Sequence, residues 1–145
     1  MTLRFLTSGE SHGRGYLTVL EGFPSGLEVP LERLRGELAR RRRGYGRGAR
    51  MTLERDVLTP WGGLRGGRTT GAPLGFVLEN TEWEQWRPVL DPEDVDPEQA
   101  EARGVYRPRP GHGDLTGCLK YGHRDARNVL ERASARSSAA WTLAG

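Results

Sequence analysis

Apolar and polar residues alternate over several short segments, which is the period expected when one side of a β-strand is buried. The pattern predicts four strands, over residues 3–7, 16–20, 51–58 and 73–78. The glycine-containing residues 9–15 would connect the first two strands, and residues 62–71 would form turns before the last one. The first half of the chain is therefore expected to be mainly strand.

Helical spacing replaces this alternation in three places. Leu31, Leu34 and Leu38 follow Pro30 and predict a helix that runs into residues 40–43. Asp114 is expected to cap a helix through residue 121. Asp125 is expected to cap another through residue 143, with a buried face of Ala126, Val129, Leu130, Ala133, Ala140 and Trp141.

The segment 83–101 carries many acidic residues and three prolines, and it is interpreted as a surface excursion. Strands come first along the chain and helices later, without a strict strand–helix alternation. This order favours an α+β fold. At 145 residues the chain is long enough for one domain, spanning residues 1–145.

Composition adds a cellular setting and a charge bias. Cys118 is the sole cysteine, which fits a reducing compartment, and no apolar run approaches membrane-spanning length. We therefore expect a cytoplasmic protein with no membrane contact. The formal net charge is +3, and all of the 22 basic residues except Lys120 are arginine. Arginine suits recognition of phosphate and carboxylate groups.

Two of the three histidines lie between glycines with an acid close by. His12 lies in Gly9-Glu10-Ser11-His12-Gly13, and His112 lies in Pro110-Gly111-His112-Gly113-Asp114. Histidine exchanges a proton near neutral pH, and flanking glycines allow a ligand close to the backbone. Two exposed loop histidines would also explain the pattern. No second His or Cys follows at metal-ligand spacing, so no metal is expected.

Arginines gather in two further places. Residues 33–50 contain eight arginines and one acid, which is compatible with a solvated helix end, a nucleic-acid-binding loop or a clamp on a small polyanion. Arg132 and Arg136 are four residues apart on one predicted helix face, where like charges repel. An anionic ligand would relieve that repulsion, and so would the neighbouring Glu131 together with solvent.

These stretches together resemble the chorismate synthase family, in the order and spacing of its motifs from residue 3 to residue 136. The matching motifs are Gly9-Glu10-Ser11-His12-Gly13, Gly44-Tyr45-Gly46-Arg47-Gly48, Arg50-Met51 with Glu54 and Asp56, Thr69-Thr70-Gly71-Ala72-Pro73, Arg109-Pro110-Gly111-His112 through Asp114-Leu115-Thr116-Gly117, Lys120-Tyr121-Gly122, and Glu131-Arg132-Ala133-Ser134-Ala135-Arg136.

The resemblance implies an activity. The family eliminates phosphate from 5-enolpyruvylshikimate 3-phosphate in a 1,4-anti sense, giving chorismate in the shikimate pathway of aromatic amino-acid biosynthesis. It needs reduced FMN, which is proposed to lend an electron and take it back, and NADPH is a possible reductant. A trianionic substrate and an anionic cofactor favour the small-polyanion interpretation of the arginines over nucleic acid.

The resemblance also assigns residues and architecture. His12 would protonate the departing phosphate and His112 would manage flavin protonation. Substrate contacts are implied for Ser11, Arg50, Arg109 and Arg136, and cofactor contacts for Arg41, Arg47, Arg132, Ala133 and Ser134. The fold would resemble the N-terminal half of the family's sandwich of antiparallel sheets and helices, in a homotetramer. Family members are more than twice this length, so residues 1–145 would form a partial family domain without its C-terminal half. We therefore expect an incomplete flavin pocket in this chain, or a non-catalytic relative.

Overall fold

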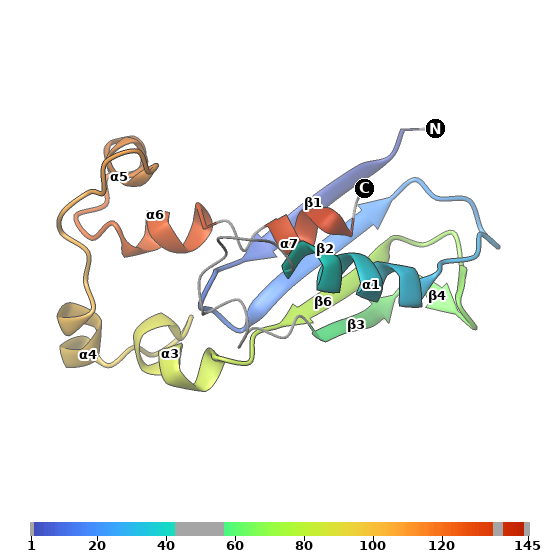
Figure 1. Cartoon of the computed structure of the whole chain (residues 1–145), viewed down its shortest axis with the longest axis horizontal. Helices are drawn as coiled ribbons and strands as arrows, with labels where there is room; N and C mark the ends of the chain where they lie inside the picture. Colours follow the sequence, from blue (N-terminus) through green and yellow to red (C-terminus); the bar gives the residue numbers. More distant parts are fainter. Residues whose placement is uncertain (1, 43–56, 135–137, 144–145) are drawn as a thin grey trace.

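An antiparallel four-stranded sheet forms one half of the molecule (Figure 1). The computed structural model describes residues 2–42, 57–134 and 138–143. The strands lie in the order β1-β2-β6-β3, and each neighbouring pair is antiparallel. Their bounds are Arg4–Gly9 for β1, Gly15–Glu21 for β2, Val57–Gly62 for β3 and Leu74–Glu79 for β6. The sequence-based prediction of an α+β fold is confirmed.

The core lies against one face of this sheet. Alternate residues of β2 and β6 point inward, among them Leu20, Phe76 and Leu78, because successive side chains of a strand face opposite sides. Helix α1 (Leu31–Arg42) and the short helix α7 (Ser138–Thr142) lie side by side across that face (Figure 1). Leu38 of α1 and Ala140 of α7 are fully buried there.

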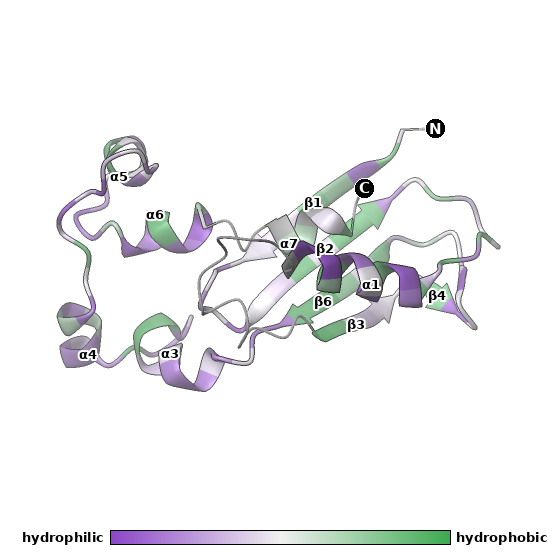
Figure 2. Cartoon of the chain, viewed as in Figure 1, coloured by the Kyte–Doolittle hydropathy of each residue, from purple (hydrophilic) through white to green (hydrophobic). Residues whose placement is uncertain are grey.

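The strands of the sheet are more apolar than the helix that covers them. Figure 2 shows apolar residues concentrated in the strands, whereas α1 is largely hydrophilic. Leu31 and Leu34 pack against the core only in part, so Leu38 provides the deepest contact of the predicted leucine stripe. Because α1 buries a single narrow stripe, its remaining surface can stay charged.

A small hairpin extends the sheet region. Strands β4 (Leu64–Arg65) and β5 (Arg68–Thr69) pair with each other inside the segment predicted as turns. Strand β3 also runs to Gly62, further than its predicted end, while residues 51–56 of that prediction lie outside the described residues. The buried Thr69 hydroxyl donates to the Pro24 carbonyl at 2.6 Å, which ties this hairpin to the chain that follows β2.

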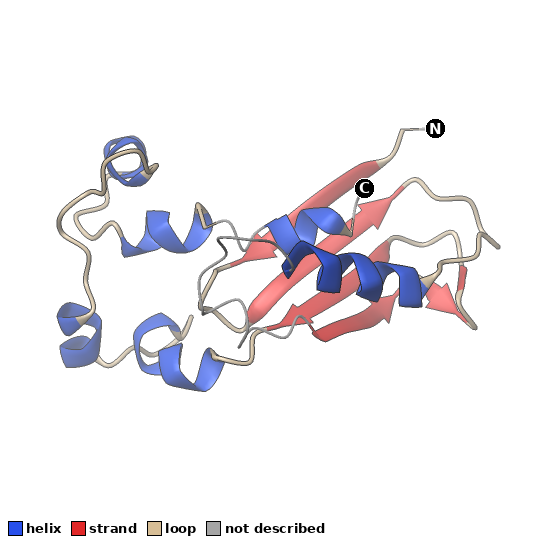
Figure 3. Cartoon of the chain, in the orientation of Figure 1, coloured by secondary structure: helices blue, strands red, loops and turns tan. Residues whose placement is uncertain are grey.

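Four short helices form the other half of the molecule (Figure 3). They are α3 (Trp83–Leu90), α4 (Pro97–Ala102), α5 (Asp114–Tyr121) and α6 (Arg127–Arg132). The segment predicted as a surface excursion thus contains α3 and α4. Asp96 caps α4 by accepting from the main-chain N–H groups of Glu98 and Gln99.

The prediction of one helix from residue 125 to residue 143 is wrong. Helix α6 ends at Arg132, and α7 begins at Ser138 on the core face of the sheet. Of the predicted buried face, Ala126, Val129 and Ala140 are buried, but Ala133 is exposed, Leu130 is half-buried and the side chain of Trp141 lies outside the described residues. The periodicity of apolar residues does not show that the two ends of this segment pack against different parts of the structure.

Two glycines inside helices give a matched test of the helical half. A Cβ at Gly117 of α5 would lie 2.4 Å from Cγ1 of Val129 on α6, whereas a Cβ at Gly36 of α1 would meet nothing within 4 Å. Gly117→Ala is expected to lower the free energy of unfolding by about 1–3 kcal/mol. Gly36→Ala is expected to raise it by about 0.5–1 kcal/mol. Urea denaturation followed by circular dichroism measures both, and equal effects would contradict the α5–α6 contact.

Candidate active site

His12 lies in the loop that joins β1 to β2, as the sequence predicted, but it is buried rather than exposed. The two strands approach closely at the base of this loop. Gly9 has φ 135°, and a Cβ there would lie 2.2 Å from the Gly15 carbonyl oxygen. Gly9 therefore allows the two strands to approach each other. The sequence had instead suggested that the glycines of this motif give a ligand access to the backbone.

Glu131 of α6 binds this loop through both its main chain and its carboxylate. Its carbonyl accepts from the Ser11 N–H at 3.1 Å. Its Oε2 accepts from the His12 N–H at 2.8 Å and lies 2.8 Å from Nδ1 of the same residue. Beside these contacts, the Ser11 hydroxyl donates to Ser134 Oγ at 2.9 Å. Residues 11–12 are thus docked onto residues 131–134.

The Glu131 carboxylate is ionised although it is almost fully buried. Burial by itself raises the pKa of Glu131, but hydrogen bonds from His12 and Arg127 outweigh it and hold the pKa below its ordinary value. Arg127 reaches Oε1 at 3.4 Å. A buried charge of this kind is stable only when such partners surround it.

Trp86 of α3 covers the His12 ring. The two ring centroids are 4.2 Å apart, with an angle of 41° between the planes. The guanidinium groups of Arg103 and Arg127 lie 5.0 and 5.2 Å from the centre of the same Trp86 ring. This stack places part of the predicted surface excursion directly over the histidine, and it excludes water from that side.

His112 belongs to a second cluster, centred on Asp114. The Asp114 carboxylate is fully buried and accepts from the Arg109 N–H at 3.0 Å and from Arg109 Nε at 2.9 Å. His112 Nδ1 contacts Asp114 Oδ1 and lies 3.1 Å from Arg109 Nη2. The Arg109 guanidinium, together with the Arg109 N–H and His112, holds the pKa of Asp114 well below its usual range.

The predicted helix caps are corrected in part. Gly113 is the N-cap of α5 and no side chain caps it, so Asp114 binds Arg109 and His112 instead of the helix N–H groups. Asp125 does act at the start of α6, where its carboxylate accepts from the Arg127 N–H at 2.8 Å and the Val105 N–H at 2.7 Å.

The two clusters meet near the end of α6. A Cβ on Gly113 would lie 3.9 Å from Cβ of Ala133, so the His112 loop passes beside the residue that precedes Ser134. Arg132 is exposed, and its guanidinium lies 5.7 Å from the centre of the Tyr121 ring. Of the predicted site residues, the structure therefore gathers Ser11, His12, Arg109, His112, Arg132, Ala133 and Ser134 around one end of α6 and the start of α5.

The other four predicted residues lie on α1 or outside the described residues. Arg41 lies near the C-terminal end of α1 and is half-buried. Arg47, Arg50 and Arg136 lie outside the described residues. Within the described part of the chain, no three His, Cys, Asp or Glu side chains are grouped as a metal ion would require, and no helix is long and apolar enough to cross a membrane.

Sequence reasoning missed Glu131 and Trp86 as site residues. Glu131 was considered only as a neighbour for the charge of Arg132, because an acid in a helix is normally solvated. On an ideal helix Glu131 falls on the opposite side from the predicted buried face of Ala126 and Val129, so the pattern gave no signal for its burial. Trp86 is an aromatic residue in an acidic, proline-containing segment, and nothing local pointed to His12.

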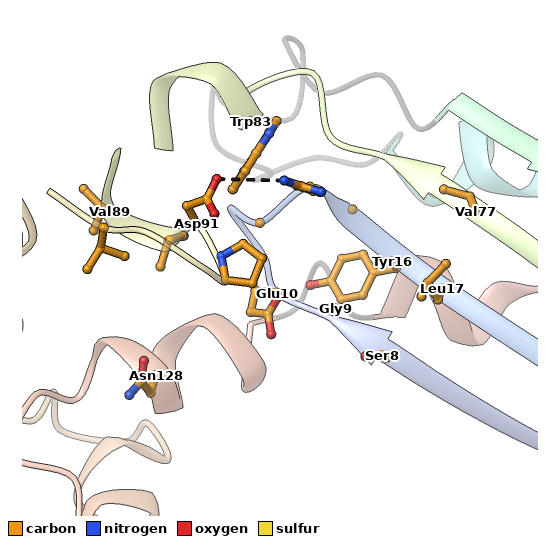
Figure 4. A pocket seen from close by; sticks show the side chains of 16 residues that line it. Ser8, Gly9, Glu10, Tyr16, Leu17, Val77, Trp83, Val89, Asp91 and Asn128 are labelled. Atoms are coloured by element: carbon orange, nitrogen blue, oxygen red, sulfur yellow. Dashed lines mark ion pairs between the residues drawn. The ribbon is translucent and has the colours of Figure 1, made fainter. Parts of the chain in front are cut away.

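A hollow of about 520 Å³ lies beside the loop that joins β1 to β2 (Figure 4). Glu10 and Gly13 of that loop line it, together with Trp83 and Asp91, and Arg14 reaches Asp91 at 3.8 Å across its edge. Neither His12 nor Ser11 lines this hollow. The hollow is therefore lined by the loop residues on either side of Ser11 and His12, and not by those two.

Comparison with known proteins identifies the class and then the family. A solved crystal structure of a chorismate synthase superposes on 98% of this chain with a TM-score of 0.69 and 37% identity, so the α+β fold is that of a chorismate synthase structure. The family model for chorismate synthase matches residues 3–145. The chain belongs to the chorismate synthase family.

Individual relatives support the same assignment. The chain is 51% identical over 143 residues to chorismate synthase of Geobacillus thermodenitrificans and 54% identical over 147 residues to that of Salinispora tropica. Each match covers 99% of this chain, but 37% and 38% of the respective relative. The chain spans 32% of the solved chorismate synthase chain. It thus corresponds to the N-terminal part of these relatives.

The Asp114 cluster leads to a test in acid. An aspartate with a lowered folded-state pKa stabilises the protein above its unfolded pKa of about 4, and this contribution is lost as the pH falls through the folded value. Asp114 is therefore expected to stay ionised through the pH range in which the aspartate of a model peptide becomes protonated. The chemical shift of its carboxyl carbon, followed by NMR, measures this. Arg109→Gln should raise the pKa of Asp114, because the hydrogen bond from the Arg109 side chain is the largest cause of its lowering.

Arg107→Gln is the matched control, since Arg107 is an exposed arginine two residues away. It is expected to leave the Asp114 titration unchanged. An Asp114 signal that titrates at the ordinary aspartate value in the unmodified protein would contradict the cluster.

Proposed function

We propose that this protein acts in chorismate synthesis, by the 1,4-anti elimination of phosphate from 5-enolpyruvylshikimate 3-phosphate. The observation that carries the proposal is the docking of residues 11–12 onto residues 131–134. The two docked segments both belong to family motifs. They are joined by the hydrogen bonds between His12 and Glu131, which are 119 residues apart in sequence. Membership of the chorismate synthase family supplies the reaction.

The described groups suit a phosphorylated dicarboxylate. Ser11 belongs to the proposed substrate set by family resemblance, and His12 can pass a proton to the departing phosphate. Arg109 is half-exposed, so its guanidinium can bind a substrate anion while Asp114 holds its Nε. Arg50 and Arg136 complete the proposed substrate set by family resemblance, and a small polyanion rather than nucleic acid is the proposed ligand.

Reduced FMN is the proposed cofactor, and the end of α6 suits it. Ala133 is small and exposed, and the exposed Arg132 offers a cation for an anionic cofactor. Ser134 follows them and belongs to the proposed cofactor set by family resemblance. His112, beside Ala133, would control the protonation state of the flavin. When bound, reduced FMN supplies an electron that is returned at the end of the cycle.

Three further features belong to the same proposal. Arg41 and Arg47 would contact NADPH if the nicotinamide serves as reductant. A homotetramer, the family assembly, agrees with the exposed apolar side chains Leu6, Leu17 and Val19 on the open face of the sheet. A cytoplasmic location agrees with the reduced thiol of Cys118.

Phosphate release tests this function directly. The protein made from its complete reading frame, supplied with 5-enolpyruvylshikimate 3-phosphate and reduced FMN, is expected to release phosphate and form chorismate. His12→Ala and His112→Ala should each lower kcat by about 10²-fold or more, because each removes a proton-transfer group.

His123→Ala is the matched control. His123 lies after α5, near Tyr121, and belongs to neither carboxylate cluster. It should leave kcat unchanged. No release above a flavin-free control would overturn the proposed function, and equal loss in all three variants would overturn the assignment of His12 and His112.

A further inference from the structure

The two ring nitrogens of His12 have different surroundings. Nδ1 lies 2.9 Å from Glu131 Oε1 and 2.8 Å from Oε2. Among residues 2–42, 57–134 and 138–143, none forms a hydrogen bond with Nε2. An ionised carboxylate only accepts hydrogen bonds, so Nδ1 must carry a proton to make this contact.

The carboxylate has no freedom to change this arrangement. Glu131 is 1% exposed, and its Oε2 also accepts from the His12 N–H. Arg127 holds Oε1, and the Arg127 guanidinium donates to the Arg103 carbonyl at 2.6 Å. Rotating the carboxylate away would leave a buried N–H group and a buried charge without partners, which is costly.

The ring itself is fixed from a second direction. Trp86 packs on its face at 4.2 Å, and that tryptophan is in turn packed under Arg103 and Arg127. Arg127 therefore binds both the carboxylate and the aromatic ring that contact His12. Flipping the imidazole would exchange Nδ1 for a C–H group against Glu131, so one orientation is strongly preferred.

His112 has a different environment at the same ring nitrogen. Its Nδ1 lies within hydrogen-bond distance of both Asp114 Oδ1, an acceptor, and Arg109 Nη2, a donor. Either neutral tautomer of His112 finds a partner there. Within the described part of the chain, Nδ1 of His12 meets acceptors alone.

We propose that Glu131 is a positioning residue for His12, which keeps a proton on Nδ1 and leaves Nε2 as the nitrogen that meets the ligand. The inference rests on the proposed function, in which His12 gives a proton to the departing phosphate. In that step the Nε2–H bond breaks and an O–H bond forms on phosphate. The Nδ1 proton stays in place before and after it, and the carboxylate remains ionised throughout.

The tautomer can be measured in the unmodified protein, without substrate or cofactor. Long-range ¹H–¹⁵N spectra of the histidine-labelled protein distinguish a protonated Nδ1 from a protonated Nε2, and His12→Gln assigns the signals by removing them. The neutral His12 ring is expected to carry its proton on Nδ1. A ring protonated on Nε2 in the unmodified protein would overturn the proposal, whether or not any variant folds.

Glu131→Gln tests the consequence for turnover. The amide keeps the shape of the side chain but can donate to Nδ1, which favours the other tautomer. With this variant kcat should fall by about 10- to 100-fold, while KM changes little because Glu131 does not touch substrate. Glu98→Gln, on the exposed side of α4, is the matched control and should change neither value.

The possible outcomes distinguish a role of Glu131 in positioning His12 from a role in stabilising the fold alone. A folded Glu131→Gln protein with unchanged kcat and an unchanged tautomer would overturn the proposal, even if its melting temperature fell. A loss of kcat together with a changed tautomer supports it. If the unmodified protein releases no phosphate, the proposed function fails, and the tautomer spectrum still decides the role of Glu131.

Discussion

The bond between His12 and Glu131 is the interaction on which the arrangement of the candidate site depends. It joins a hairpin loop at the end of the sheet to a short helix 119 residues further along the chain. The neighbouring bonds, from the Ser11 N–H and the Ser11 hydroxyl, repeat the same connection. Such a buried charge destabilises a fold unless its partners are complete, so this contact selects one relative placement of loop and helix.

The sheet provides one side of that contact and the helices provide the other. Strands β1 and β2 pair along their whole length, from Arg4 with Glu21 to Gly9 with Tyr16, so the loop that carries His12 starts from a rigid base. Helices α3 to α6 bury little apolar surface of their own. Salt bridges, aromatic contacts and caps position them instead. Trp86 of α3 and Glu131 of α6 contact the same imidazole.

The sequence was sufficient for local elements and insufficient for their partners. Alternation located three strands, and leucine spacing located α1, because a period reports directly which side of an element is buried. The helix predicted over residues 125–143 failed because its two ends bury against different partners, α5 for Val129 and the sheet for Ala140. The motifs located His12 and His112. Trp86 and Glu131 were missed because their contact with His12 depends on tertiary packing alone.

The two histidines show why residue type and flanking glycines do not settle a role. Both face a buried, ionised carboxylate through Nδ1, and both motifs look alike in sequence. The difference is Arg109, which gives His112 a donor as well as an acceptor, whereas the described contacts of His12 Nδ1 are with the carboxylate alone. A proton on Nδ1 is therefore required at His12 and optional at His112. It follows that the environment each histidine acquires on folding, more than its motif, determines which nitrogen is free to react.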